Sequence, residues 1–505
     1  MENRIRLKAG VPNDKNRDYL PEAIYHSQMV VNENGNNSQP YPERLQEFHE
    51  EIVEKDKEDV WFEYVPESYD GSEKVPLIIS LHGGLMTGWG QAIYSSWTLV
   101  ADRDNCIVFF PNAFSRRMWL VEYSQKDLIN KAMADEPEEL HADVPPENPD
   151  DNHDIRLILN LIDRAKEKYN IDEGRIFIQG MSAGNLMGAF FSRYYGSRIT
   201  GLGESAGPTF DPGLLFNEDG SLHNYSGPMA VWQTRPERNG VPDFVSYTDL
   251  ELYRYNREYW LKVNKCDPVP AISILGENNF AFYKGEGAPF VYLDVKNRDH
   301  GQTFDEAFLQ WDYLFSGVRK KPDGSIEDVG SRLERKGDSF NVALYEGTNT
   351  VLLNNQLIDL DRPVMRWQKL KYHGQNGKEL VRGDYIMVPL SFVEKCAGAK
   401  LEYQNDRQEA DVTLPDGRKL QFATGSIGCI IDNDLRQMYC ETIFRHNELY
   451  ISFEWFARMI MGWTSSECDG IVYVTDHHAE LAINMADLIR DLLCRDMWSE
   501  VAKNA

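Results

Sequence analysis

The stretch Arg175-Ile-Phe-Ile-Gln-Gly-Met-Ser-Ala-Gly-Asn-Leu-Met-Gly-Ala-Phe-Phe-Ser-Arg-Tyr-Tyr195 decides the fold of this chain. A short apolar run, Ile176 to Ile178, predicts a β-strand, and the apolar residues at the end of the stretch favour a helix. Between them, Gly180-Met-Ser-Ala-Gly184 is typical of a nucleophile elbow, where strand and helix come so close that only glycine fits on either side of the serine. We therefore expect Ser182 at the tip of a tight turn, with the N–H of Ala183 directed at an oxyanion forming there.

A second stretch, Gly203-Glu-Ser-Ala-Gly207, fits the same Gly-x-Ser-x-Gly pattern. Pro208 and Pro212 follow it and exclude the helix that an elbow requires. The motif carries meaning only in its structural context, so we favour Ser182 as the nucleophile and place Ser205 in a loop after the next strand.

A continuous apolar run, Val75 to Leu81, predicts a strand buried on both faces, as in a parallel sheet. His82-Gly-Gly follows directly. Backbone N–H groups at such a strand end face the open edge of the sheet, so Gly84 or Leu85 is expected to supply a second oxyanion donor. For His82 itself we favour a buried histidine bonded to backbone over a catalytic one.

Further apolar strands are predicted at 107–111, 228–232 and 290–295, and an amphipathic helix is predicted at 154–169. Strands alternating with helices around a serine elbow indicate an α/β fold, a doubly wound and mostly parallel sheet. In such a sheet with a serine elbow, the acid and then the histidine of the triad come later in the chain.

His300 stands in Asn297-Arg-Asp-His-Gly301, a loop just past the last predicted strand. Of the eleven histidines, it is the one that combines the chain order, the loop and the strand end that a general base for Ser182 requires.

Composition restricts the possible functions. The 505 residues carry a formal charge of −27, which repels phosphate backbones and anionic lipid, so nucleic acid and membrane surfaces are not expected as partners. No run approaches the roughly 20 apolar residues of a membrane span. No secretory signal is visible at the N-terminus, which indicates a cytoplasmic protein, or an extracellular one if a signal was removed. The seven cysteines are scattered, and they argue against a disulfide framework or a zinc site.

Two segments have no clear chemical role. Residues 1–57 are interpreted as an arm or cap, with a charged helix expected from about Pro42 to Lys57. The acidic stretch 122–151 is expected as an insertion on the active-site side, either a lid or, for most of its charges, a solvated loop.

Residues 58–320 resemble α/β-hydrolase esterases of the poly(3-hydroxybutyrate) depolymerase and feruloyl or acetylxylan esterase type. The resemblance lies in the strand ending in His82-Gly-Gly, the elbow segment 172–188, and the His300-Gly301 loop with its closing helix. It implies a Ser-His-acid triad without metal or organic cofactor. It also places the acid in a His-Gly-x-x-Asp motif that this chain lacks. Counting without gaps puts Glu237 at the acid position, and a small shift puts Asp243 there; both stay open, with Glu237 favoured.

After a charged linker, 321–338, the chain becomes β-rich and contains an internal repeat. The segment 385–399 corresponds to the segment 449–463. Each copy is predicted to form a strand and a helix, followed by a further strand. Hairpin-like pieces begin at Val351 and Cys429. This pattern resembles the copper amine oxidase-like N-terminal or stalk domain, an accessory module that does not carry the copper. Its histidines show no ligand spacing that demands a metal. A scaffold, a surface for forming a homo-oligomer, and a binder of glycan or cell wall all remain open.

The expected organisation is therefore an arm (1–57), an esterase domain (58–320), a linker (321–338), an accessory domain (339–480) and a C-terminal helix (481–505). The expected function is a serine esterase acting on carbohydrate-linked or polyester acyl groups. A serine peptidase of the same fold and a catalytically silent adhesion or assembly protein are the alternatives.

Overall fold

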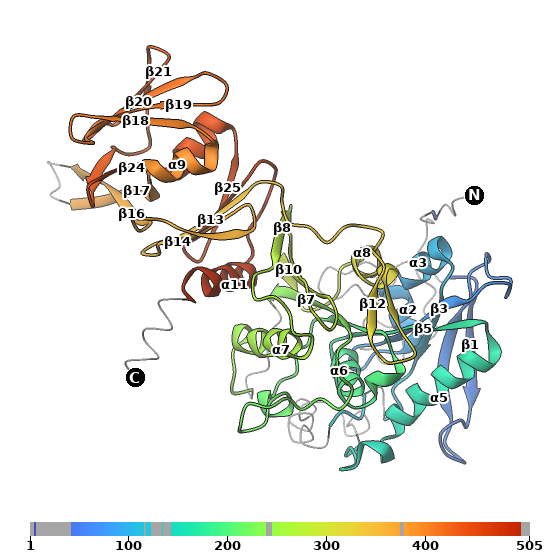
Figure 1. The fold of residues 1–505 in the computed structure, drawn as a ribbon. Coiled ribbons are helices and arrows are strands. Elements are labelled where there is room, and N and C mark those ends of the chain that lie inside the picture. Colours follow the sequence, from blue (N-terminus) through green and yellow to red (C-terminus); the bar gives the residue numbers. More distant parts are fainter. Residues whose placement is uncertain are drawn as a thin grey trace. The chain divides into compact units, whose positions relative to one another are not determined.

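The computed structural model describes residues 5–6, 42–115, 118–122, 134, 143–238, 245–373 and 378–495. The chain forms two compact units (Figure 1). The first comprises Met1–Pro270 and Ala281–Arg335, and the second comprises Ala271–Phe280 and Lys336–Ala505. Across the described ranges, no helix is both long and apolar enough to cross a bilayer.

A ten-stranded sheet has the order β1-β2-β4-β3-β5-β6-β7-β10-β9-β8. From β4 to β10 the neighbouring strands run parallel, whereas β1 and β2 are antiparallel additions at one edge. Every residue of β3, β4 and β6 is buried, as expected for strands covered on both faces. The strands are β1 (Leu45–Glu50), β2 (Asp59–Tyr64), β3 (Val75–Leu81), β4 (Ile107–Pro111), β5 (Ile171–Met181), β6 (Gly201–Ser205), β7 (Ala230–Arg238), β8 (Ala271–Leu275), β9 (Asn278–Tyr283) and β10 (Phe290–Asp299).

Helices connect the parallel strands, and three of them begin with a side-chain cap. Asn152 caps α5 by accepting two backbone N–H bonds, and Thr248 and Glu251 form a capping box at the start of α7. This arrangement is the α/β-hydrolase fold, a doubly wound and mostly parallel sheet, as the sequence predicts. The helices are α2 (Gly88–Tyr94), α3 (Trp97–Asp104), α5 (His153–Lys168), α6 (Ala183–Tyr195), α7 (Asp249–Val263) and α8 (Glu306–Tyr313).

Two expected features differ in the structure. The helix expected over 42–57 is wrong, because this segment forms β1, which pairs with β2 and stacks Phe48 on Trp61 at 5.2 Å. Its charged residues favour a helix by propensity, but pairing at a sheet edge outweighs that preference. The expected linker, 321–338, contains a strand, since β11 (Val318–Lys320) and β12 (Ile326–Asp328) form a hairpin. Most of the acidic insertion, 122–151, lies outside the described residues.

The second unit contains three antiparallel sheets: β15-β14-β13-β26-β25, β16-β17-β24-β23 and β18-β19-β20-β21-β22. Their strands are β13 (Asn341–Tyr345), β14 (Thr350–Leu353), β15 (Gln356–Asp359), β16 (Met365–His373), β17 (Lys378–Pro389), β18 (Lys400–Gln404), β19 (Glu409–Thr413), β20 (Lys419–Ala423), β21 (Gly428–Ile431), β22 (Asp434–Gln437), β23 (Ile443–Arg445), β24 (Glu448–Ser452), β25 (Thr464–Cys468) and β26 (Ile471–Thr475). Its helices are α9 (Leu390–Ala397), α10 (Phe453–Trp455), which continues as the π-helix η9 (Phe456–Met461), and α11 (Ile483–Leu493).

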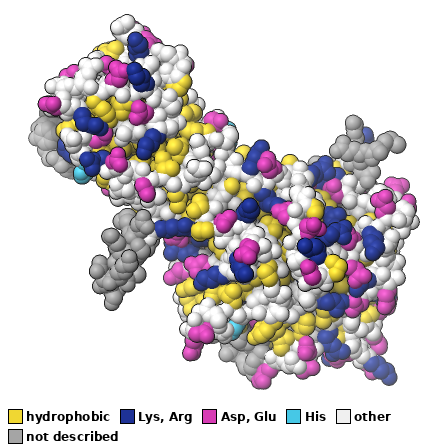
Figure 2. Space-filling view, viewed as in Figure 1, with side chains coloured by type: hydrophobic (Ala, Val, Ile, Leu, Met, Phe, Trp, Pro, Cys, Tyr) yellow, Lys and Arg dark blue, Asp and Glu magenta, His cyan; other side chains and the backbone are white. Residues whose placement is uncertain are grey.

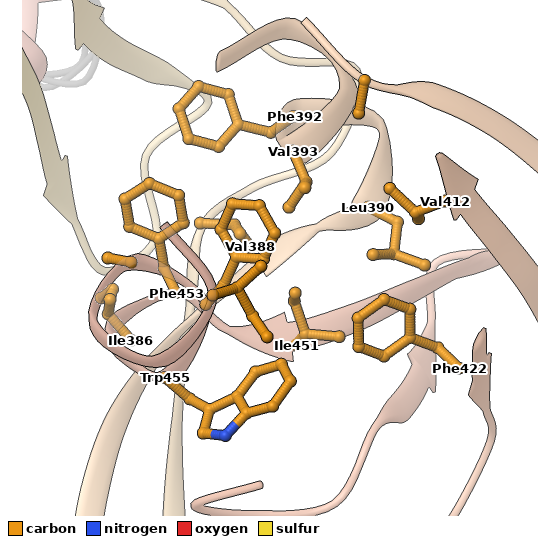
Figure 3. Close-up of a cluster of buried hydrophobic side chains, with 14 of the residues drawn as sticks. Ile386, Val388, Leu390, Phe392, Val393, Val412, Phe422, Ile451, Phe453 and Trp455 are labelled. Carbon is orange, nitrogen blue, oxygen red and sulfur yellow. The ribbon is translucent and has the colours of Figure 1, made fainter. Parts of the chain in front are cut away.

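The internal repeat is present in the second unit. β17-α9-β18 corresponds to β24-α10-η9-β25, and both helical segments end at a left-handed glycine, Gly398 (φ 61°) and Gly462 (φ 70°). The two copies share one core, in which the ring centroids of Phe392 and Phe453 lie 5.5 Å apart (Figure 3). The predicted hairpins are confirmed as β14-β15 and β21-β22.

The surface carries charges of both signs. On the face seen in Figure 2, acidic and basic side chains are interspersed. The excess of 80 acidic over 53 basic residues is therefore not gathered into a single acidic patch on that face.

Candidate active site

Ser182 occupies the turn between β5 and α6, with φ 54° and ψ −117°. Such a strained conformation in a residue other than glycine is characteristic of functional turns. A Cβ on Gly180 would lie 2.1 Å from the carbonyl oxygen of Gly184, and one on Gly184 would lie 2.4 Å from that of Leu81. Both glycines are therefore required by backbone contacts, for the reason that the sequence pattern predicts.

His300 lies one residue beyond β10, and its Nε2 is 2.8 Å from the Oγ of Ser182. The strands β5 and β10 run in the same direction, so their carboxyl ends bring the two side chains to one edge of the sheet. Burial lowers the pKa of His300, because desolvation disfavours the imidazolium ion, and the charge of Asp249 acts in the opposite direction. A neutral imidazole beside a serine hydroxyl can accept its proton.

The carboxylates expected beside His300 do not all lie where the sequence places them. Glu237 does not follow β7 but lies within it, and its Oε2 accepts the backbone N–H of Asn297 at 2.8 Å. Asp243 lies outside the described residues. Among the described residues, Asp249, in the first turn of α7, is a carboxylate whose charge acts on His300.

The sequence patterns did not single out Asp249. The capping box of Thr248 and Glu251 is a sequence signal that could have located the start of α7. It would have placed a carboxylate at the helix end that follows β7, the region in which the triad acid is sought.

The second expected oxyanion donor, Gly84 or Leu85, lies in the loop that follows β3. Gly84 is adjacent to the start of α6, since a Cβ on Gly84 would lie 3.7 Å from that of Ala183. Leu85 has a left-handed backbone (φ 60°) in a turn closed by the hydrogen bond from Met86 N to Gly83 O. The N–H of Ala183 belongs to the first helical turn, where the helix itself supplies no acceptor.

His82 shapes this loop. Its Nε2 accepts the N–H of Ala113 at 2.9 Å, so its Nδ1 carries the hydrogen and donates to the carbonyl of Gly83 at 2.6 Å. The carbonyl of His82 in turn accepts the indole N–H of Trp119 at 2.8 Å. His82 is thus buried and bonded to backbone, as predicted.

Ser205, the serine of the second motif, is completely buried. It is the last residue of β6, and its hydroxyl donates to the carboxyl of Glu306. Within the described ranges, no group of three or more His, Cys, Asp or Glu side chains is arranged to hold a metal ion.

No protein-family model and no curated protein matches this chain. Among solved structures, it is similar to an acetyl xylan esterase from Aspergillus awamori (13% identity, TM-score 0.38), with 53% of this chain and 97% of that chain covered. It is also similar to a ferulic acid esterase from Anaeromyces mucronatus (16% identity, TM-score 0.32), with 55% of this chain and 92% of that chain covered. A third similar structure is a poly(3-hydroxybutyrate) depolymerase from Bordetella parapertussis (14% identity, TM-score 0.29), with 43% of this chain and 76% of that chain covered. Likenesses of this strength carry no argument about activity.

Proposed function

We propose that the first unit is a serine hydrolase that cleaves carboxylic esters through an acyl-enzyme. The observation that carries the proposal is the 2.8 Å contact between His300 Nε2 and Ser182 Oγ, at the tip of a strained turn between strand and helix. A hydroxyl is a weak nucleophile until a neighbouring base accepts its proton, and a neutral imidazole at hydrogen-bond distance is suited to that task.

In this mechanism, Ser182 Oγ bonds to the ester carbonyl carbon while its proton moves to His300 Nε2. The carbonyl oxygen becomes an anion held by the N–H of Ala183 and that of Gly84 or Leu85, each donor contributing about 3 kcal/mol. When the intermediate collapses, the carbon–oxygen bond to the alcohol breaks, and His300 returns the proton to the leaving alcohol. Water then releases the acid by the same steps.

The carboxylate that orients the imidazole has three candidates: Asp249, whose charge raises the pKa of His300, and the two from the sequence, Glu237 and Asp243. Oε2 of Glu237 accepts the backbone N–H of Asn297, and a carboxylate has further acceptor sites, so this bond does not exclude Glu237. An Asp or Glu in this role holds the imidazole in the tautomer that leaves Nε2 ready to accept a proton.

The substrates that we propose are acyl groups esterified to carbohydrate, or polyesters. The family resemblance of residues 58–320 supports this class. The loop ending in His82-Gly-Gly and the elbow at Ser182 are the matching segments.

Hydrolysis of short p-nitrophenyl esters tests the proposal. Ser182→Ala should lower kcat/KM by at least about 1,000-fold, and a fluorophosphonate probe should label the unaltered protein but not this variant. Ester hydrolysis that survives in Ser182→Ala would contradict the mechanism. Activity on amides but not on esters would favour a serine peptidase, and failure of the probe to label Ser182 would favour an adhesion or assembly protein.

For the second unit we propose an accessory module of the copper amine oxidase N-terminal-like kind. The repeat of strand, helix and strand, with Gly398 and Gly462 at matching helix ends, supports this assignment. Its role as scaffold, homo-oligomer surface or glycan binder can be separated by sedimentation of the full chain with and without soluble polysaccharide.

A further inference from the structure

The second Gly-x-Ser-x-Gly turn lies directly behind the first. The N–H of Ser182 donates to the carbonyl of Ser205 at 3.0 Å. The side-chain amide of Asn185, in α6, donates to the carbonyls of Ala206 (2.8 Å) and Gly207 (2.6 Å). A Cβ on Gly207 would lie 2.8 Å from the Cα of Ser182. The position of the candidate nucleophile is therefore set by the backbone of residues 205–207.

The side chain of Ser205 connects this turn to a second element. Its hydroxyl donates to the carboxyl group of Glu306 and accepts the side-chain N–H of Gln179 at 3.0 Å. Glu306 begins α8, and its Oε2 accepts the N–H of Thr303 at 3.3 Å. Thr303 stands three residues after His300. One carboxyl group thus links the turn behind the candidate nucleophile to the loop of the candidate base.

The partners of the Glu306 carboxyl group among the described residues are neutral donors. Besides Ser205 of β6 and Thr303 of the loop, they are the hydroxyl of Thr234 in β7 and the amide of Gln310 in α8, the latter at 2.9 Å. Four donors match the acceptor sites of an ionised carboxylate, whereas burial favours the neutral acid. An amide at this position would turn an N–H toward a donor.

We propose that Ser205 and Glu306 form a positioning pair that sets the distance between Ser182 and His300. Neither residue touches the reacting atoms. The pair acts by hydrogen bonds that connect the turn behind Ser182 to the loop of His300 and so fix their relative positions. This role rests on the proposed function. In it, the second Gly-x-Ser-x-Gly motif supports the catalytic serine and does not itself supply a nucleophile.

Ser205→Ala and Glu306→Gln test the pair. Each should lower kcat about tenfold, since a displacement of about 1 Å at the reacting atoms can cost even more. Each should leave KM within about twofold of the unaltered protein, because the pair lies behind the serine and away from the substrate. The rate of labelling by a fluorophosphonate should fall in parallel with kcat.

Ser80→Ala is the matched control. Ser80 is also buried. Its hydroxyl donates to the same side chain, Gln179, at 2.7 Å and accepts from Gln91 at 3.0 Å, so neither of these bonds joins it directly to Ser182 or to the His300 loop. It should lower the melting temperature about as much as Ser205→Ala while kcat and labelling stay unchanged. This separates positioning from a general loss of stability.

The outcomes are distinct. Wild-type kcat in both Ser205→Ala and Glu306→Gln, or an equal loss of kcat in Ser80→Ala, would overturn the positioning pair and leave the hydrolase intact. An unaltered protein that neither hydrolyses esters nor reacts with the fluorophosphonate would overturn the proposed function, and the catalytic meaning of the pair with it.

Discussion

The two Gly-x-Ser-x-Gly turns have the same pattern and opposite structures. In the first, the serine itself has a positive φ (54°), so Ser182 projects from the turn that joins β5 to α6. In the second, Ser205 ends β6 in extended backbone, and the positive φ falls on the next residues, Ala206 (53°) and Gly207 (58°). The shift of one residue decides which side chain is presented and which is buried.

The glycines of the two turns also serve different purposes. Gly180 and Gly184 allow the backbones of β5, α6 and β3 to meet. Gly203 makes room for the side chain of Gln310, whose Oε1 would lie 2.3 Å from an added Cβ, and Gly207 makes room for Ser182. The pattern therefore marks tight packing in both places, and only the backbone conformation of the serine distinguishes a candidate nucleophile from its support.

The largest expected effect concerns Asp249, the carboxylate at the first turn of α7. If Asp249 orients His300, Asp249→Asn should lower kcat/KM for p-nitrophenyl esters about 1,000-fold, because the amide no longer stabilises the imidazolium formed during catalysis. The folded state should persist, because a change at the first turn of an exposed helix end costs about 1 kcal/mol or less. Kinetic assays measure the loss of kcat/KM, and thermal melting of the same preparation measures the stability of the folded state.

Glu237→Gln and Asp243→Asn are the controls for this prediction. If Asp249 is the acid, both should retain kcat/KM within about twofold. A large loss in Asp243→Asn with an active Asp249→Asn would move the acid into the segment between β7 and α7. It would leave the roles of Ser182 and His300 unchanged.

The same glycine-to-alanine change should have unequal effects in the two turns. In Gly184→Ala the new methyl group would lie 2.4 and 2.5 Å from the carbonyl oxygens of Leu81 and His82, which are backbone atoms of a buried strand end. We expect a loss of about 3 kcal/mol in the free energy of unfolding, together with loss of activity. In Gly203→Ala the closest atoms belong to the side chain of Gln310, which can move, so a loss of about 1 kcal/mol is expected.

Urea unfolding of both variants measures this difference. The comparison between the turns would fail if Gly203→Ala were the more destabilising of the two. Equal losses would indicate that the side chain of Gln310 is held as rigidly as the backbone of β3.

The sequence predicted those parts of the fold and site that depend on local pattern and chain order. Apolar strands, the elbow glycines at 180 and 184, and the hairpin at Val351 follow from short segments. The chain order of serine and histidine was also sufficient to select His300, whose Nε2 lies at 2.8 Å from the serine. Local conformation and topology are largely encoded in such segments.

The rest depends on pairings between distant segments. The strand predicted at 228–232 ends before Glu237, but β7 continues to Arg238 because it pairs with β10 as far as Asp299. The segment of β1 forms a strand because it pairs with β2 at the edge of the sheet. The hydrogen bond from Ser205 to Glu306 joins residues 101 positions apart in the sequence, so no local pattern predicts it.

The smallest expected effect is a pH dependence of stability that arises at Glu306, beneath both turns. Burial raises the pKa of Glu306 to about 7, from an ordinary value of 4.5. A carboxyl group with a raised pKa in the folded state stabilises the fold fully below pH 4.5, and this contribution is lost as the pH rises to about 7. Between pH 6 and 8 the free energy of unfolding of the unaltered protein should therefore fall by about 1 kcal/mol relative to Glu306→Gln, which does not titrate. Urea unfolding of the two proteins at both pH values measures the difference. A constant difference would mean that Glu306 is ionised throughout this range, held by its four donors, and that the support behind Ser182 is an anion.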